Sequence, residues 1–165
     1  QGQVGMALKY KRFDLSFDFY YRLGFDIING VAMNTQGMND RNNQSKAVLR
    51  RWRVPSDEPV ANQLPRAYYG NPANNLGSNR YVERGDFIRL NNVKIGYKLP
   101  KNQCDKLGLT KLDFSLTARK LWTLTNYSGQ DPEVWMDASD PFVVGVDNAR
   151  TPPSQSVTLN IAIGF

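Results

Sequence analysis

The longest regular pattern in the chain runs from residue 13 to residue 23, where hydrophobic and polar positions alternate. The odd positions are hydrophobic or aromatic: Phe13, Leu15, Phe17, Phe19, Tyr21 and Leu23. A period of two predicts a β-strand with one hydrophobic and one polar face. Globular strands usually run about 5–6 residues, whereas a tilted strand that crosses a bilayer needs roughly 9–11. We therefore interpret this stretch as a transmembrane strand of a β-barrel.

Four more stretches show the same alternation, so the predicted fold is all-β and antiparallel. In the third strand the phase changes, because Ile88 and Leu90 lie in one phase and Val93 and its successors in the other. A β-bulge near Asn91 and Asn92 would restore one continuous face. The expected strands cover residues 3–10, 13–23, 86–99, 111–123 and 156–165.

The connections between these strands differ in length in a regular way. Short connections cover residues 11–12 and 100–110, and long ones cover 24–84 and 125–154. Outer-membrane barrels have short periplasmic turns and long external loops, whereas the alternative, a soluble β-sandwich, has no reason to sort its loops. Local signals predict a short helix over 45–52, capped by Ser45, and a single helical turn in 101–110, ended by Gly108.

Composition removes several classes of function. No run reaches the roughly 18 apolar residues of a membrane helix. The net charge of +6 is spread along the chain without a nucleic-acid-binding motif, so we expect no nucleic acid. The chain has no His, a single Cys (Cys104, expected to be an ordinary turn residue), no nucleophile elbow and no phosphate-binding glycine loop. We therefore expect no enzymatic activity, no cofactor and no metal.

Several blocks of the sequence resemble a known family. Residues 80–100 contain Arg-Leu-x-Asn-Val-x-x-Gly-Tyr-x-Leu-Pro, a strand at 117–124 leads into Asp131-Pro132-Glu133, and residues 152–161 form a closing strand. Together with the helix at 43–52, they resemble the SusC/RagA-like TonB-dependent transporters. Lys120 departs from this pattern, which has Asn before Leu-Trp.

The resemblance implies that residues 1–165 are the C-terminal portion of a 22-stranded barrel, with the plug domain and the remaining strands absent from this chain. It implies import of oligosaccharides or peptides across the outer membrane of a Gram-negative bacterium. The implied partners are a SusD-like surface lipoprotein that acts as a lid, the TonB complex, the rest of the barrel and plug, membrane lipid and lipopolysaccharide. The alternative is an outer-membrane or soluble β-protein whose loops serve binding or adhesion without active transport.

Individual residues receive predictions on this basis. Tyr68, Tyr69, Tyr127 and Trp135 are candidates for contact with a ligand or with the lid, and loop packing is the alternative. Phe165 resembles the terminal aromatic that serves as a barrel-assembly signal, and it also fits an interfacial aromatic. The predicted aromatic belt consists of Tyr10, Phe13, Tyr97 and Phe165.

Charged residues receive predictions too. Asp14, Asp18 and Arg22 are expected to line the lumen or contact the plug. The loop acids Asp131, Glu133, Asp137 and Asp140 offer oxygen ligands for Ca²⁺, but the EF-hand spacing is missing and loop solvation is the preferred interpretation. The alternatives for Arg50, Arg51 and Arg53 are contact with lipopolysaccharide phosphates and a solvated helix face.

Overall fold

The chain consists of two units in the computed structural model, which describes residues 1–57, 63–76, 78–134 and 145–165. The strand unit comprises Gln1–Phe25, Asp86–Asn126 and Pro152–Phe165. The loop unit comprises Asp26–Gly85 and Tyr127–Thr151. In the described ranges, no helix has the length and hydrophobicity needed to span a membrane.

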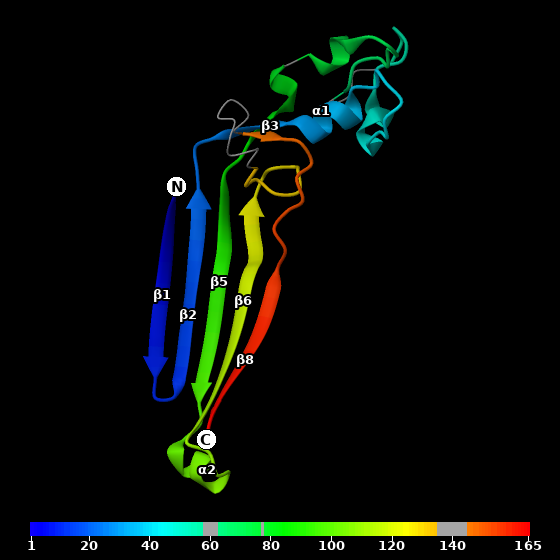
Figure 1. Ribbon diagram of the computed structural model, residues 1–165. Coiled ribbons are helices and arrows are strands. Elements are labelled where there is room, and N and C mark those ends of the chain that lie inside the picture. Colours follow the sequence, from blue (N-terminus) through cyan, green and yellow to red (C-terminus); the bar gives the residue numbers. More distant parts are fainter. Residues whose placement is uncertain (58–62, 77, 135–144) are drawn as a thin grey trace, which may run out of the picture. The chain divides into compact units, whose positions relative to one another are not determined.

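The strand unit is one antiparallel sheet of five long strands (Figure 1). The strands pair in the order in which they follow along the chain, and β1 and β8 form the edges of the sheet. All five predicted strands are confirmed, with ends within two residues of expectation: β1 (Gly2–Tyr10), β2 (Phe13–Arg22), β5 (Phe87–Lys98), β6 (Lys111–Thr125) and β8 (Ser156–Gly164).

The short connections also match expectation. Lys11 and Arg12 alone join β1 to β2, with Lys11 at φ 54°. Between β5 and β6 lies the predicted helical turn, α2 (Lys101–Lys106), and Gly108 follows it at φ 68°. A left-handed residue just after a helix lets backbone N–H groups bond back to the last carbonyls, and the Leu109 N–H donates to the Cys104 carbonyl at 2.9 Å.

The predicted β-bulge is confirmed in β5. Asp18 of β2 pairs with Asn92, and the next residue, Phe19, pairs with Leu90, so Asn91 has no partner in this ladder. One inserted residue reverses the alternation of faces along a strand. Leu90 and Val93 therefore project from the same side of the sheet, although an even–odd count would separate them.

The loop unit contains a small sheet that the sequence patterns did not predict. The central strand β3 (Asp26–Asn29) pairs antiparallel with β4 (Val82–Arg84) and parallel with β7 (Val146–Asp147). Helix α1 (Gly30–Gln36) follows β3 directly, and the Asn29 Oδ1 atom caps it by accepting from the Ala32 N–H at 2.8 Å.

Short 3₁₀ helices complete the loop unit: η1 (Lys46–Arg50), η2 (Pro72–Asn75) and η3 (Asn79–Tyr81). The helix expected over 45–52 is therefore shorter, but its cap is confirmed, because Ser45 Oγ accepts from the Ala47 N–H at 3.3 Å. Val48 of η1 packs with Met38 and Leu64 in a small hydrophobic cluster. This cluster anchors the turn against distant parts of the loop.

Candidate functional site

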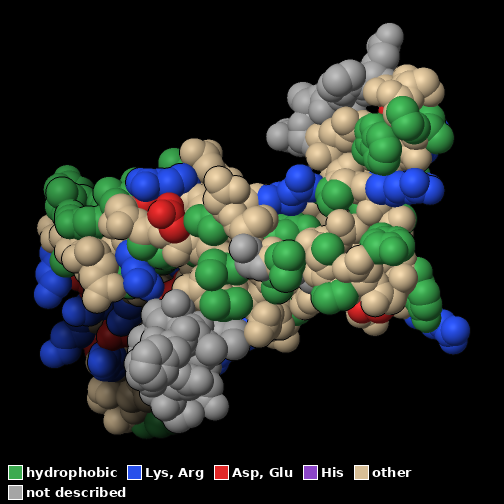
Figure 2. Space-filling view, turned by 90° about the horizontal axis from the view of Figure 1, so that it is seen from above, with side chains coloured by type: hydrophobic (Ala, Val, Ile, Leu, Met, Phe, Trp, Pro, Cys, Tyr) green, Lys and Arg blue, Asp and Glu red, His purple; other side chains and the backbone are tan. Residues whose placement is uncertain are grey.

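The register of the strand unit gathers hydrophobic side chains on one face. One cross-strand row runs through all five strands, from Leu8 to Leu15, Ile95, Leu116 and Leu159. Four of these side chains are strongly exposed, from 43% for Leu116 to 61% for Leu159. Figure 2 shows exposed hydrophobic side chains (green) at the surface alongside Lys and Arg (blue). Burying one large aliphatic side chain is worth about 1.5–3 kcal/mol, so this face requires an apolar environment.

Aromatic side chains lie toward both ends of this hydrophobic face. At the turn end, Tyr10, Phe13, Tyr97 and Phe114 occupy one cross-strand row, and the Phe13 and Tyr97 rings are 4.7 Å apart. The row contains three of the four predicted belt residues and adds Phe114. Tyr21 lies toward the other end, roughly 27 Å along β2 from Phe13 at about 3.3–3.4 Å per residue. Phe17 and Phe19 lie between these ends on the same face, so the row at the turn end is the one that matches an aromatic girdle of an outer-membrane barrel.

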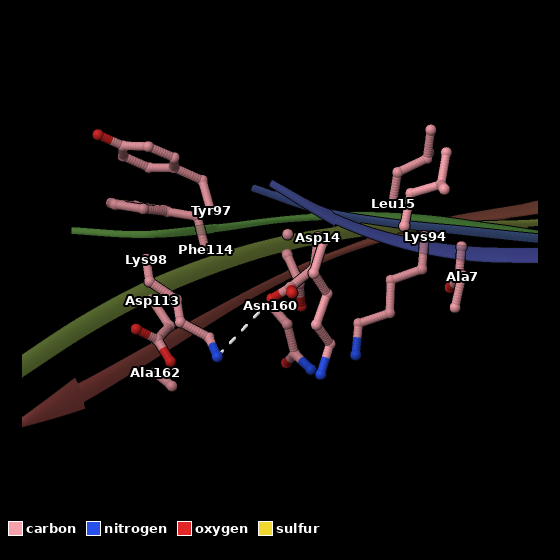
Figure 3. A pocket seen from close by; sticks show the side chains of 15 residues that line it. Ala7, Asp14, Leu15, Lys94, Tyr97, Lys98, Asp113, Phe114, Asn160 and Ala162 are labelled. Atoms are coloured by element: carbon pink, nitrogen blue, oxygen red, sulfur yellow. Dashed lines mark ion pairs between the residues drawn. The ribbon is translucent and has the colours of Figure 1, made fainter. Parts of the chain in front are cut away.

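The opposite face of the sheet is polar and forms a hollow of about 480 Å³. Figure 3 shows Lys98, Asp113 and Asn160 on one side of the strands and Tyr97 and Phe114 on the other. This surface carries two ion pairs, one between β5 and β2 with 3.7 Å from Lys98 Nζ to Asp14 Oδ2, and one within β6 with 3.1 Å from Lys111 Nζ to Asp113 Oδ2. The sheet thus separates a hydrophobic surface from a charged, hydrogen-bonding one.

One charged residue and one carboxylate oxygen on the polar face are unusually buried. The Arg89 side chain is 2% exposed, its Nε donates to Thr123 Oγ1 at 3.0 Å, and its guanidinium lies 5.1 Å from the Phe87 ring centre. Asp18 Oδ2 is buried and has no hydrogen-bond partner among the described residues. Buried polar side-chain atoms are normally hydrogen-bonded to protein or to ordered water, so this atom is an exception on the polar face.

In the loop unit, the Glu83 carboxylate connects three segments of chain. It accepts hydrogen bonds from the Ser128 N–H at 2.9 Å, from Ser128 Oγ at 2.7 Å and from Asn29 Nδ2 at 2.9 Å. Burial alone would raise the pKa of Glu83, but the hydrogen bonds from Ser128 and Asn29 outweigh it and lower the pKa below its ordinary value. Glu83 therefore joins β4 to β3 and to the chain after β6 as an ionised group.

A second polar pair lies beside this network. The Tyr127 hydroxyl donates to Asp147 Oδ2 at 2.6 Å, and the Ala149 N–H donates to Oδ1 at 3.0 Å. Burial and the Asp147 carboxylate both raise the pKa of Tyr127, so its hydroxyl stays protonated. Gly129 is required at its position, because a Cβ there would collide with the Tyr127 ring.

These groups border a pocket of about 330 Å³. Its lining combines the end of β3 and helix α1 with the segment after β6 and strand β7: Asn29, Val31, Ala32, Thr35, Gln36, Ser128, Gly129, Gln130, Asp147 and Ala149. Two of the lining residues, Asn29 and Asp147, are both buried and hydrogen-bonded.

The structure distributes the four predicted contact aromatics unequally. Tyr68 and Tyr69 are 61% and 66% exposed, and Arg41 Nε donates to the Tyr69 hydroxyl at 3.1 Å. Tyr127 is only 6% exposed and is bound to Asp147, as in the loop-packing alternative. Trp135 lies outside the described residues. A contact role for the set stays a prediction, and Tyr68 and Tyr69 are the described members that a partner can reach.

The remaining predictions can be placed as follows. Phe165 is 91% exposed and its carbonyl accepts from Thr110 Oγ1 at 3.3 Å, so the assembly role stays a prediction.

Asp137 and Asp140 lie outside the described residues, and Asp131 Oδ1 accepts from the Glu133 N–H at 2.8 Å. The described residues contain no cluster of potential metal-ligating side chains. Cys104, expected to be a turn residue, lies in α2 and is 1% exposed.

Sequence reasoning missed the polar network of the loop unit. Asn29, Glu83, Ser128 and Asp147 lie far apart in the chain and show no periodic spacing. Glu83 belongs to the block at 80–100 that resembles the SusC/RagA-like family, and this resemblance is the one sequence feature that points to Glu83.

No family model matches the chain. The TonB-dependent receptor P3 of Formosa agariphila is 30% identical over 164 residues, which cover 96% of this chain and 15% of the receptor. The TonB-dependent receptor P39 of the same organism is 26% identical over 174 residues, covering 99% of this chain and 16% of that receptor. This chain is related to the TonB-dependent receptors. It spans about one sixth of the length of these relatives.

Solved structures agree with this relationship to the TonB-dependent receptors. The RagAB peptide importer, in its closed-closed and in its open-open state, matches with a TM-score of 0.77 and 25% identity. Each match covers 99% of this chain and 17% of the importer chain. The SusC/RagA-like resemblance and the fold class, a segment of an antiparallel transmembrane barrel, are therefore confirmed.

Proposed function

We propose that this chain forms part of the barrel wall of an outer-membrane TonB-dependent transporter in a Gram-negative bacterium, and that the transporter imports oligosaccharides or peptides. The observation that carries the proposal is the two-faced sheet, in which the register keeps one side hydrophobic from β1 to β8 and the other side polar. Such a sheet can separate lipid from a water-filled or plugged lumen. The likeness to a peptide importer supports the direction of transport.

In this proposal the chain is the C-terminal portion of the barrel, and a plug and the remaining strands come from elsewhere in the same protein. Two features support it. The edge strands β1 and β8 require neighbours, because unpaired backbone groups do not persist in hydrocarbon. Asp18 lies on the polar side, and its buried Oδ2 atom has no hydrogen-bond donor among the residues that the structure describes. A plug seated against this face would supply one.

The proposed partners are a SusD-like lipoprotein lid on the external side of the outer membrane and the TonB complex on its periplasmic side. The exposed rings of Tyr68 and Tyr69 support a partner at the loops, since tyrosines are frequent anchors of protein interfaces. Lipopolysaccharide and membrane lipid are the proposed surroundings of the hydrophobic face. The proposal includes no catalytic step.

Energised uptake in the bacterium that encodes the full-length protein tests this function. Fluorescent oligosaccharide and peptide mixtures are supplied to wild-type cells, to cells lacking this protein and to cells lacking TonB. We expect one of the two mixtures to accumulate in wild-type cells and in neither mutant, while cells lacking TonB still bind it at their surface. Surface binding with no accumulation in wild-type cells would favour the binding or adhesion alternative.

A further inference from the structure

A stretch of the loop unit combines exposed aromatic rings with an excess of positive charge. Residues 41–80 contain seven Lys and Arg residues but only two acids, Asp57 and Glu58. Asp57 is already engaged, because its carboxylate pairs with Arg53 at 3.1 Å and accepts from the Arg53 backbone N–H at 2.6 Å. The Arg53 charge is therefore paired, and the stretch as a whole keeps an excess of positive charge.

An open slot of about 740 Å³ lies within this stretch, and we call it the Trp52 slot. Its lining consists of Trp52, Pro65, Arg66, Ala67, Tyr68 and Asn74. The Trp52 N–H donates to the Leu64 carbonyl at 2.8 Å, which fixes Trp52 beside the segment that carries Arg66. The slot thus brings two aromatic rings, one guanidinium group and one amide together from three segments.

The position of Arg66 is fixed through its backbone. Asn74 Nδ2 donates to the Arg66 carbonyl at 2.8 Å, and the buried Tyr81 hydroxyl donates to the Asn74 carbonyl at 3.3 Å. The guanidinium of Arg66 itself makes no hydrogen bond or ion pair within the part of the chain that the structure describes. A free guanidinium offers paired donors that match a carboxylate in a bidentate geometry.

The chemistry of the slot favours a sugar over a peptide. An extended peptide is usually held by free backbone groups at a strand edge. Here the backbone groups of Trp52, Leu64 and Arg66 just described are already bonded. Aromatic rings remain, and they suit the flat C–H face of a sugar ring, because stacking needs no backbone partner and buries apolar surface.

We propose that the Trp52 slot binds a carboxylate-bearing sugar unit of an acidic oligosaccharide. Arg66 pairs with the carboxylate, and Trp52 and Tyr68 stack against the ring. The assignment of this sugar as a transport substrate rests on the proposed import function. The binding itself is measurable without transport.

Calorimetry on the full-length protein in detergent tests the slot. The probes are trigalacturonate, maltotriose as the neutral trisaccharide, a tri-glutamate peptide and inorganic phosphate. We expect trigalacturonate to bind at least tenfold more tightly than each of the others. Arg66→Gln should weaken it at least tenfold, Arg66→Lys should weaken it less, and Tyr68→Ala should weaken both trisaccharides.

Arg80→Gln is the matched control, because it removes one positive charge from the same stretch without touching the slot. It should change the affinity for trigalacturonate less than twofold. An equal loss of trigalacturonate affinity in Arg66→Gln and Arg80→Gln would show that only the net charge of the stretch matters. That result would overturn the site. Arg66-dependent preference for tri-glutamate or for phosphate would overturn the sugar assignment in favour of a peptide or a lipopolysaccharide phosphate.

Failure of this inference can be told apart from failure of the proposed function. TonB-dependent uptake of another substrate, together with no binding of trigalacturonate, would refute the slot and leave import standing. Arg66-dependent binding of trigalacturonate without TonB-dependent uptake would support the slot and refute import.

Discussion

Lys120 of β6 lies opposite Asn91 of β5, where the ladder between these strands changes register. The pairing passes from Leu90–Trp122 to Asn92–Arg119, so Lys120 and Leu121 together oppose the single residue Asn91. Lys120 adopts φ 54°, in the left-handed region. This conformation costs most L-residues roughly 1–2 kcal/mol, and Asn and Gly are exempt or nearly so.

Replacement of Lys120 should therefore stabilise the barrel. We expect Lys120→Gly to raise the free energy of unfolding in detergent by about 1 kcal/mol and Lys120→Asn by somewhat less. The control is Lys94→Gly in β5, where φ is not positive and the substitution should destabilise the sheet. Denaturant titration of the full-length protein measures both. A loss of stability in Lys120→Gly would contradict the strain at this position.

The two faces of β8 should respond oppositely to a charge. Leu159 lies on the hydrophobic face and Asn160 on the polar one. We expect Leu159→Lys to destabilise folding into lipid vesicles by about 2–4 kcal/mol, while Asn160→Lys changes it by less than about 1 kcal/mol. Urea titration of the vesicle-bound protein provides the measurement. Equal costs at the two positions would argue that lipid does not cover the face that carries Leu159.

Glu83 should make the loop unit sensitive to acid. The pKa of its carboxyl is lower in the folded protein than the unfolded value of 4.5, so the ionised form stabilises the fold at neutral pH. This contribution is lost as the pH falls below 4.5 through the folded pKa. We expect the Ser128 amide, which donates to Glu83, to lose protection from hydrogen exchange over that range.

Glu83→Gln serves as the comparison for this pH dependence. At pH 7 it should already exchange faster at Ser128, by an amount that corresponds to about 1 kcal/mol of lost hydrogen bonding. Its exchange, corrected for the intrinsic rate, should then show no such loss of protection as the pH falls from 6 to well below 4.5. If wild type and Glu83→Gln show the same pH dependence, another carboxyl group controls this region.

Deletion of Phe165 should reduce insertion into the outer membrane without disturbing the loop unit. The side chain is 91% exposed and contributes little packing, so a defect in assembly would reflect recognition of the end of the chain. The measurement compares the amount of heat-modifiable, folded protein in outer-membrane fractions. Phe165→Tyr should insert normally, and normal insertion of the deletion would contradict the assembly role.

Sequence patterns were sufficient for the strand unit because the surroundings impose the alternation. Each strand must present hydrophobic residues to one medium and polar residues to another, so even the bulge at Asn91 left a visible change of phase at Val93. The loop unit has no such external constraint. Its small sheet joins β3 to β7 through residues more than one hundred positions apart, and Glu83 acts through hydrogen bonds that have no period. The contact aromatics show the same limit, since Tyr127 and Tyr68 are chemically alike and only tertiary packing buries the first.

The division of the sheet into a hydrophobic face and a polar face determines how this segment should behave when it is expressed by itself. Because the edge strands β1 and β8 have no neighbouring strand in this sheet and its hydrophobic face is exposed, the isolated segment should aggregate in aqueous buffer and become dispersed only in detergent. The segment therefore depends on a bilayer, or a substitute for one, along one face and on polar surroundings along the other.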